Sequence, residues 1–173
     1  MKYIIIVIMV FGSCSGIKES VVDINTGKKV AGYSQDCNYQ LGKTKRSDLS
    51  IAEWEKLQKD GLGFGFSNNY AQKSPDDYLT GVGFNGHYST SKGVKVNDPA
   101  QKALATYGKP KAMILDYGKN EESHIHWVYH GLFYKNLTFL TDSSFNTILG
   151  IVVGYESMFD PSLNKKYIKK QIR

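Results

Sequence analysis

The sequence has few cysteines, no long apolar run and no evident set of catalytic side chains. These shortages argue against a disulfide-rich scaffold, a membrane-spanning helix and an enzyme, in that order. Only two of its 173 residues are cysteine, so the chain can form at most one disulfide. The apolar run that follows Lys2 is too short to cross a bilayer as a stable helix. The acidic pairs at 76–77 and 121–122 fall in expected loops, without partners placed for acid–base chemistry. We therefore predict that the protein is not an enzyme.

The composition is that of a folded protein rich in short strands and turns. Hydrophobic residues make up 41% of the chain and charged residues 22%, which is ordinary for a globular domain. The sequence also contains twelve tyrosines and seventeen glycines, which favour strands and turns. A chain of this length can bury a real core as one domain.

Residues 1–13 have the layout of a secretory signal peptide, with one lysine, a short apolar run and small residues at the end. The segment Phe-Gly-Ser-Cys at 11–14 resembles a bacterial lipobox, in which the cysteine is acylated and becomes the first mature residue. Phe11 departs from that pattern, because an aliphatic residue is commoner there. We expect a lipid on Cys14 and a tether over residues 14–28. The alternative is a plain signal peptide with an incidental cysteine.

Cys37 is then the only remaining thiol, unless an oxidising compartment joins it to Cys14 in a disulfide. No cationic side chain stands beside it in the segment Gln-Asp-Cys-Asn, so nothing nearby in sequence would stabilise a reactive thiolate. We expect Cys37 to be inert.

The formal net charge is +6, with basic runs at 43–46 and in the tail at 160–173. We expect no nucleic-acid partner, because an exported protein rarely meets one. The charge points instead to anionic lipid headgroups or polysaccharide. The simpler interpretation of the tail is a solvated segment.

Residues 93–110 predict a well-delimited helix. Asn97 or Asp98 suits the N-cap, and Pro99 suits the first turn. Apolar residues then recur at i, i+3, i+4 and i+7, which gives one stripe made of Ala100, Ala103, Leu104 and Tyr107. Gly108 can end the helix in a positive-φ conformation.

An earlier helix is expected at 51–60, where Ser50 and Glu53 match a capping box. Its apolar face would consist of Ile51, Trp54 and Leu57. Strands are expected near 29–33, at 62–69, and at 78–88 with a buried set of Leu79, Val82 and Phe84. After residue 110, apolar runs broken at Gly131 and other turn residues predict an antiparallel meander of three or four strands.

The order of elements suggests two tandem copies of one α-β-β(-β) unit. We predict an α+β fold in which helices cover one face of an antiparallel sheet. A single domain would span residues 29–173, with the first unit at about 48–88 and the second at about 93–155.

Several segments of the second half carry a resemblance to a known family. They are Tyr-Ser-Thr-Ser-Lys-Gly-Val-Lys-Val-Asn-Asp at 88–98, Tyr-Gly-Lys-Pro at 107–110, and apolar strands at 127–129, 137–139 and 148–153. This part of the chain resembles the β-lactamase-inhibitor-protein-like superfamily, which includes small envelope lipoproteins of the SmpA/OmlA type. Asn97 stands where that group usually has glycine. The resemblance covers under half of the chain. It implies a protein-binding or scaffolding role without catalytic residues.

A histidine-rich segment at 124–130 offers a candidate metal site. On a strand, His124 and His126 share a face with their Cβ atoms about 7 Å apart, close enough to bind one zinc or copper ion. His130 lies too far along to join them, and no nearby strand supplies an obvious third ligand. The simpler interpretation is a half-exposed strand with its aromatic face in the core. We therefore expect no cofactor unless this pair binds zinc.

We predict a lipid-anchored protein of the bacterial cell envelope that binds another envelope protein through an exposed, aromatic-rich sheet face. Tyrosine and tryptophan provide large contact areas at small entropic cost. The candidate contact residues are Tyr78, Tyr88, Trp127, Tyr129 and Tyr134. Burial in the core is the rival interpretation for each and the favoured one for Trp127. The alternative function is a periplasmic or surface binder of a small ligand, glycan or metal at the His124/His126 face.

Overall fold

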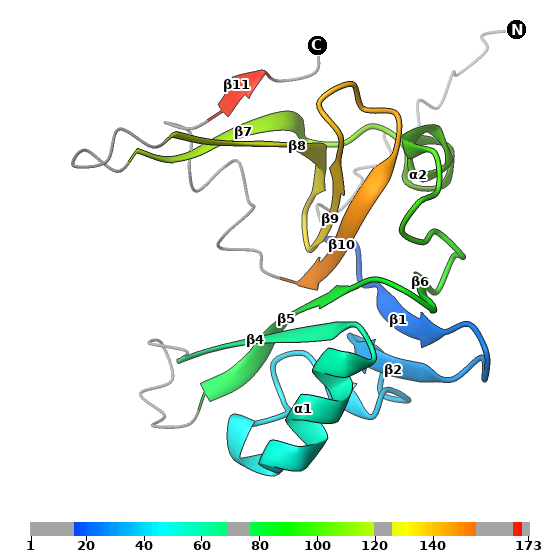
Figure 1. Ribbon diagram of the computed structural model, residues 1–173, viewed down its shortest axis with the longest axis vertical. Coiled ribbons are helices and arrows are strands. Elements are labelled where there is room, and N and C mark those ends of the chain that lie inside the picture. The colour runs from blue at the N-terminus through cyan, green and yellow to red at the C-terminus, as the bar shows by residue number, and fades with distance from the viewer. Residues whose placement is uncertain (1–15, 69–76, 120–125, 155–167, 171–173) are drawn as a thin grey trace, which may run out of the picture.

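Two sheets and two α-helices form an α+β fold, which confirms the predicted fold class (Figure 1). The structure is a computed structural model that describes residues 16–68, 77–119, 126–154 and 168–170. The larger sheet has the strand order β11 (Ile168–Lys170), β7 (Ala112–Lys119), β8 (His126–Tyr134), β9 (Leu137–Thr141), β10 (Ile148–Gly154), β5 (Asp77–Phe84) and β4 (Leu62–Asn68). The smaller sheet has the order β3 (Tyr39–Gln40), β2 (Lys29–Gly32), β1 (Ser20–Asp23) and β6 (Tyr88–Thr90). The helices are η1 (Arg46–Asp48), α1 (Ile51–Lys59) and α2 (Ala100–Tyr107).

The two units expected from the sequence meet inside the larger sheet. In the first, α1 leads into the antiparallel pair β4–β5. In the second, α2 leads into the antiparallel meander β7–β8–β9–β10. Antiparallel pairing of β10 with β5 joins the units. Each unit therefore covers a strand edge that the other would leave unpaired.

Gly131 does not separate two strands, as the sequence suggested, but lies inside β8. A Cβ added there would lie 2.4 Å from the carbonyl oxygen of Phe139 on β9. The glycine therefore permits a close approach of two strands rather than a turn.

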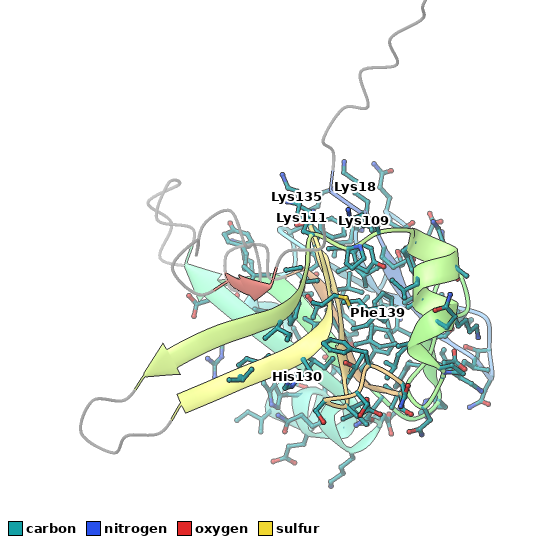
Figure 2. The ribbon with its side chains drawn as sticks, turned by 90° about the horizontal axis from the view of Figure 1, so that it is seen from above. Lys18, Lys109, Lys111, His130, Lys135 and Phe139 are labelled. Atoms are coloured by element: carbon teal, nitrogen blue, oxygen red, sulfur yellow. The ribbon has the colours of Figure 1, made fainter. Side chains whose placement is uncertain are left out.

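One face of the larger sheet carries the core. Leu62, Phe84, Ile151 and Phe139 lie opposite one another on neighbouring strands, and each is at most 4% exposed. Tyr107 of α2 packs on Phe139 with ring centroids 5.4 Å apart, and Figure 2 shows Phe139 in the middle of the side chains. Buried residues of β1 and β2 join the same cluster. The smaller sheet and α2 therefore cover the same face.

The helix α1 docks on this face through aromatic contacts. Its N-cap is Ser50, whose side chain accepts from the Glu53 N–H at 3.2 Å as predicted, whereas the Glu53 side chain bonds a tyrosine of β3 instead of completing the box. Trp54 packs on Phe66 of β4 with ring centroids 5.7 Å apart. The expectation for Ile51 is wrong, because this residue is 80% exposed. β4 is the last strand at this edge of the sheet, and it covers Trp54 but leaves Ile51 to solvent.

The helix α2 begins at Ala100, so its N-cap lies one or two residues later than the predicted position. Pro99 occupies the N-cap position without a side-chain bond, so the cap role expected of Asn97 or Asp98 is wrong. Asp98 instead accepts from the Lys95 N–H at 2.9 Å and stabilises the turn before the helix. The glycine after the helix does have a positive φ, of 75°, as predicted for Gly108.

The predicted tether at 14–28 is wrong from residue 16 onward. β1 lies between β2 and β6 with Val21 fully buried, and Glu19 just before it is 2% exposed. β1 has only four residues, too few to show a clear strand pattern in the sequence. Its stability comes from pairing with β2 on one side and β6 on the other. The folded domain therefore includes residues 16–28, which precede the boundary expected at residue 29.

Candidate functional site

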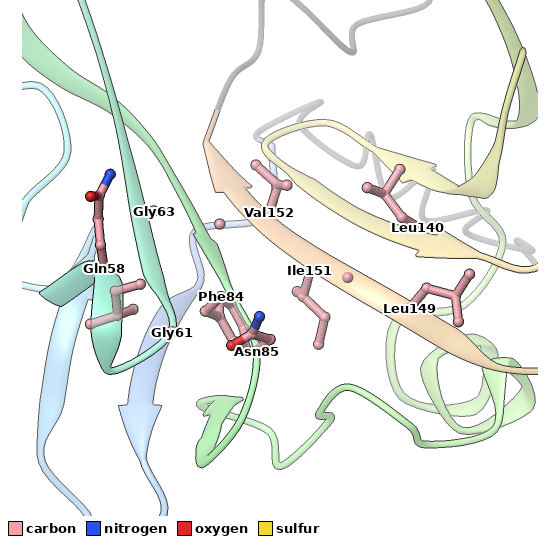
Figure 3. A pocket seen from close by; sticks show the side chains of 12 residues that line it. Gln58, Gly61, Gly63, Phe84, Asn85, Leu140, Leu149, Ile151 and Val152 are labelled. Carbon is pink, nitrogen blue, oxygen red and sulfur yellow. The ribbon is translucent and has the colours of Figure 1, made fainter. Parts of the chain in front are cut away.

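The larger sheet carries an open groove over β4, β5, β10 and β9, and Gln58 of α1 lines part of its rim (Figure 3). Gly63, Gly83 and Val152 are register partners on β4, β5 and β10, and they alternate along their strands with the core residues. They therefore belong to the outer face. The groove has a volume of about 450 Å³ and is lined by Gln58, Gly61, Leu62, Gly63, Gly83, Phe84, Asn85, Leu140, Leu149, Gly150, Ile151 and Val152.

Two paired glycines form the floor of the groove. A Cβ added at Gly63 or at Gly83 would lie at least 3.9 Å from every atom beyond the adjacent residues, and neither residue has a positive φ. The backbone therefore does not require glycine at either position. Glycine inside a strand is less stable than alanine by roughly 0.5–1 kcal/mol. The visible effect of the two glycines is to keep this part of the sheet free of side chains.

The walls of the groove are aliphatic. Leu140, Leu149 and Val152 rise from β9 and β10 on one side, as Figure 3 shows. Leu149 is 58% exposed, and its position beside other apolar groups makes a patch rather than an isolated surface leucine. Among the residues that line the groove there is no carboxyl, amine, imidazole, hydroxyl or thiol side chain. The lining can bind apolar groups, and it offers no acid, base or nucleophile.

Amide side chains lie at the other end of the groove. Asn85 follows β5, and its N–H donates to the Gly61 carbonyl oxygen at 3.1 Å. Gly61 has a φ of 91°, and a Cβ there would collide with the Asn85 amide oxygen. Glycine at this position therefore allows Asn85 to sit over the start of β4. Together with Gln58 of α1, it supplies the hydrogen-bonding groups of the groove.

Tyr88 and Tyr134, two of the predicted contact residues, are buried. The Tyr134 hydroxyl donates to the Gly108 carbonyl oxygen at 2.8 Å, and burial raises the pKa of Tyr134 to about 12. Burial also raises the pKa of Tyr88. Both belong to the main core, which the helices and the smaller sheet cover. Their prediction as contact residues is wrong.

Tyr78 and Tyr129 are half-buried, and neither lines the groove. The Lys45 ammonium lies 5.8 Å from the centroid of the Tyr78 ring. Tyr129 packs against a small second cluster formed by Ala112 and Phe133. The groove is thus aliphatic and glycine-rich, whereas the sequence suggested an aromatic binding face.

The remaining predicted residues of the histidine segment lie wholly or partly outside the described structure. His126 and Trp127 belong to β8, but their side chains are not among those described, and His124 falls outside the described residues. The zinc site therefore stays a prediction. Within the described ranges, no group of three or more His, Cys, Asp or Glu side chains is placed to hold a metal ion. The His130 ring packs against Phe145 with centroids 5.7 Å apart.

Cys37 is a buried free thiol, and its Sγ donates to the Ser20 hydroxyl oxygen at 3.6 Å. Its burial is consistent with an inert role. Cys14 lies outside the described residues, so its lipidation stays a prediction.

A buried carboxyl group that the sequence did not reveal ties the N-terminal segment to the rest of the fold. Glu19 Oε1 accepts from the N–H groups of Ser20 at 2.9 Å and Ser91 at 3.0 Å, and also from the Ser91 hydroxyl. Its Oε2 accepts from the Tyr107 hydroxyl at 2.6 Å. Burial and then this hydrogen bond raise the pKa of Tyr107. The cluster joins β1, the turn after β6 and α2, and it lies apart from the groove.

No family model, curated protein or solved structure matches this chain. The resemblance of residues 88–153 to the envelope lipoproteins therefore stays an expectation. In the part of the chain that is described, no helix is long and apolar enough to cross a membrane.

Proposed function

We propose that the protein is a non-catalytic binding module of the bacterial cell envelope, held at the membrane by lipid on Cys14. Its groove over β4, β5, β10 and β9 would receive a segment of another envelope protein. The observation that carries the proposal is the pair Gly63 and Gly83, where side chains would fit but are absent. Glycine at these two strand positions lowers the stability of the fold, and no local steric contact requires it. A role of the bare backbone in binding would explain why glycine is present.

The chemistry of the lining favours a polypeptide with apolar side chains. Leu140, Leu149 and Val152 offer apolar contact, and the amides of Gln58 and Asn85 can bond a peptide backbone. The groove is open on the sheet surface and has no charged group in its lining, so it suits an extended segment of a neutral, apolar character.

Co-purification from solubilised membranes tests this proposal. The wild-type protein should retain a stoichiometric protein partner, and Gly83→Val should lose it because the valine fills the groove floor. Leu149→Ser should weaken the complex by removing an exposed apolar contact.

A matched control uses another exposed aliphatic residue. Ile24 is 47% exposed and does not line the groove, so Ile24→Ser should leave the complex intact. Equal loss of the partner in both serine variants would contradict the proposal. A wild-type protein that retains no protein but is stabilised by a small apolar molecule would indicate a small-ligand binder instead.

A further inference from the structure

Four lysines gather where the described chain begins. The Ile17 N–H donates to the Lys135 carbonyl oxygen at 3.0 Å, which places Lys18 beside the β8–β9 turn. The Lys111 N–H donates to the Phe133 carbonyl oxygen at 2.7 Å, which brings the α2–β7 connection to the same place. Figure 2 shows the resulting group, here called the basic face, which consists of Lys18, Lys109, Lys111 and Lys135.

The basic face is presented to solvent. Lys18, Lys109 and Lys111 are exposed, and Lys135 is partly exposed. Glu19 follows Lys18 directly, but its carboxyl group is buried and accepts hydrogen bonds from Ser91 and Tyr107. This neighbouring acid therefore does not lie on the surface beside the lysines.

We propose that the basic face rests on the anionic headgroups of the bilayer that holds the Cys14 lipid. This inference depends on the lipid anchor of the proposed function. Gly16 lies against the Lys135 side chain, since a Cβ added at Gly16 would be 2.7 Å from Lys135 Cγ. Only Ser15 separates Gly16 from Cys14, and two residues span at most about 7 Å. An acyl chain on Cys14 would therefore hold the basic face at the level of the headgroups.

The expected electrostatic effect is large enough to set the orientation of the domain. A lysine close to an anionic leaflet changes membrane partitioning roughly fivefold, so three exposed lysines together give about a hundredfold. The attraction falls off within a Debye length and is weakened by salt. The lipid would supply the attachment, and the lysines would select which side of the domain faces the membrane.

Lysine acylation in vesicles tests the orientation. The full lipidated protein is reconstituted in vesicles of phosphatidylcholine alone or with one third phosphatidylglycerol, and modification is measured by mass spectrometry. In the anionic vesicles, modification of Lys18, Lys109 and Lys111 should slow about fivefold, and high salt should restore it. The control lysines, exposed elsewhere on the surface, should not change; they are Lys28, Lys43 and Lys56.

Matched triple variants sharpen this test because they have the same net charge. In K28Q/K43Q/K56Q, modification of Lys135 should be slower in anionic than in neutral vesicles. In K18Q/K109Q/K111Q, Lys135 should be modified equally fast in both. If the basic-face lysines and the control lysines of the acylated wild-type protein were modified equally in anionic vesicles, the basic-face proposal would be overturned. The lipid anchor would not be affected by that result. Absence of the acyl mass on Cys14 would overturn the anchor, and with it the inference that depends on it.

Discussion

Glu19 shows how much a single residue can hold together in this fold. Its carboxyl group accepts from Ser91 and Tyr107, which are more than seventy residues away in sequence. Nothing in the local sequence distinguishes Glu19 from the exposed acids of the chain. Its role comes from three segments that meet only in the folded molecule, so the sequence predicted a tether where the structure has a buried cluster.

Glu19→Ala should lower the free energy of unfolding by about 3 kcal/mol or more. The substitution leaves the buried Ser20 N–H without its acceptor, and it also removes the acceptor of three partly buried donors on Ser91 and Tyr107. A buried donor without an acceptor costs roughly 1–3 kcal/mol, and a partly buried donor costs less because water can reach it. Urea denaturation measures the change, and Glu55→Ala on the exposed side of α1 is the control, expected within about 0.5 kcal/mol of wild type. A Glu19→Ala protein as stable as that control would show that the cluster does not hold the N-terminal segment.

Three tyrosines should make the protein less stable in alkali. Burial raises the pKa of Tyr134 to about 12, and burial with a glutamate hydrogen bond raises the pKa values of Tyr39 and Tyr107. In the unfolded chain these hydroxyls titrate near their ordinary value of about 10. The unfolded state therefore loses protons first, and the tyrosine contribution to stability is complete below pH 10 and falls as the pH rises toward 12.

The measurement is the urea midpoint as a function of pH, with tyrosinate absorbance followed in the folded protein. We expect a nearly constant tyrosine contribution up to about pH 9 and a falling midpoint above pH 10. Ionisation of all tyrosines near pH 10 while the protein stays folded would contradict this account of the buried hydroxyls.

Among the elements, glycines have two different roles that the sequence alone does not separate. Gly108 ends α2 with φ 75° and ψ −154°, a combination that is essentially restricted to glycine. Gly83, in contrast, has extended backbone and room for a Cβ. The helix-ending glycine was predicted because caps are local. The role of Gly63 and Gly83 in the groove was not predicted, because it depends on the register that pairs them across two strands.

Gly108→Val should destabilise the protein by about 1–3 kcal/mol through backbone strain. A Cβ at this position would meet no atom within 4 Å. The loss of stability would therefore come from the backbone conformation and not from a steric clash of the Cβ atom. Thermal denaturation provides the measurement, and partner binding by the folded fraction should be unchanged. Wild-type stability in this variant would contradict the conformation assigned to the end of α2.

Gly83→Val should have the opposite effect on stability. Valine is favoured in strands, and its Cβ would come no closer than 3.9 Å to the Gly63 carbonyl oxygen, so unfolding should become harder by up to about 1 kcal/mol. The same denaturation measurement provides the test. Marked destabilisation would show that the glycine is needed by the fold and would remove the argument that it serves the groove.

For the whole molecule, sequence patterns predicted the class of fold and most of its elements. The helices at 51–59 and 100–107 and the buried set on β5 follow from local periodicity and capping. In the smaller sheet, β2 was predicted near 29–33, whereas β1 and β3 were missed because they are short and depend on distant partners. The groove was missed because it is defined by residues of β4, β5 and β10 that become neighbours only through pairing.

The function of the molecule as proposed depends on two surfaces, the groove and the basic face. The groove would receive the partner, and the basic face would orient the domain on the bilayer. The two are lined by different residues, so variants in one should leave the other intact. Variants in the groove should therefore lose partner binding but keep the membrane orientation, and variants in the basic face should do the reverse.

Photo-crosslinking from the groove in living cells tests the central claim most directly. A photoreactive amino acid is placed at Leu149, and in a second strain at the exposed control position Ile24. We predict a discrete protein adduct from position 149 that disappears when Gly83→Val is added, and none from position 24. No adduct at position 149, or the same adducts from both positions, would contradict the assignment of the groove as a protein-binding site.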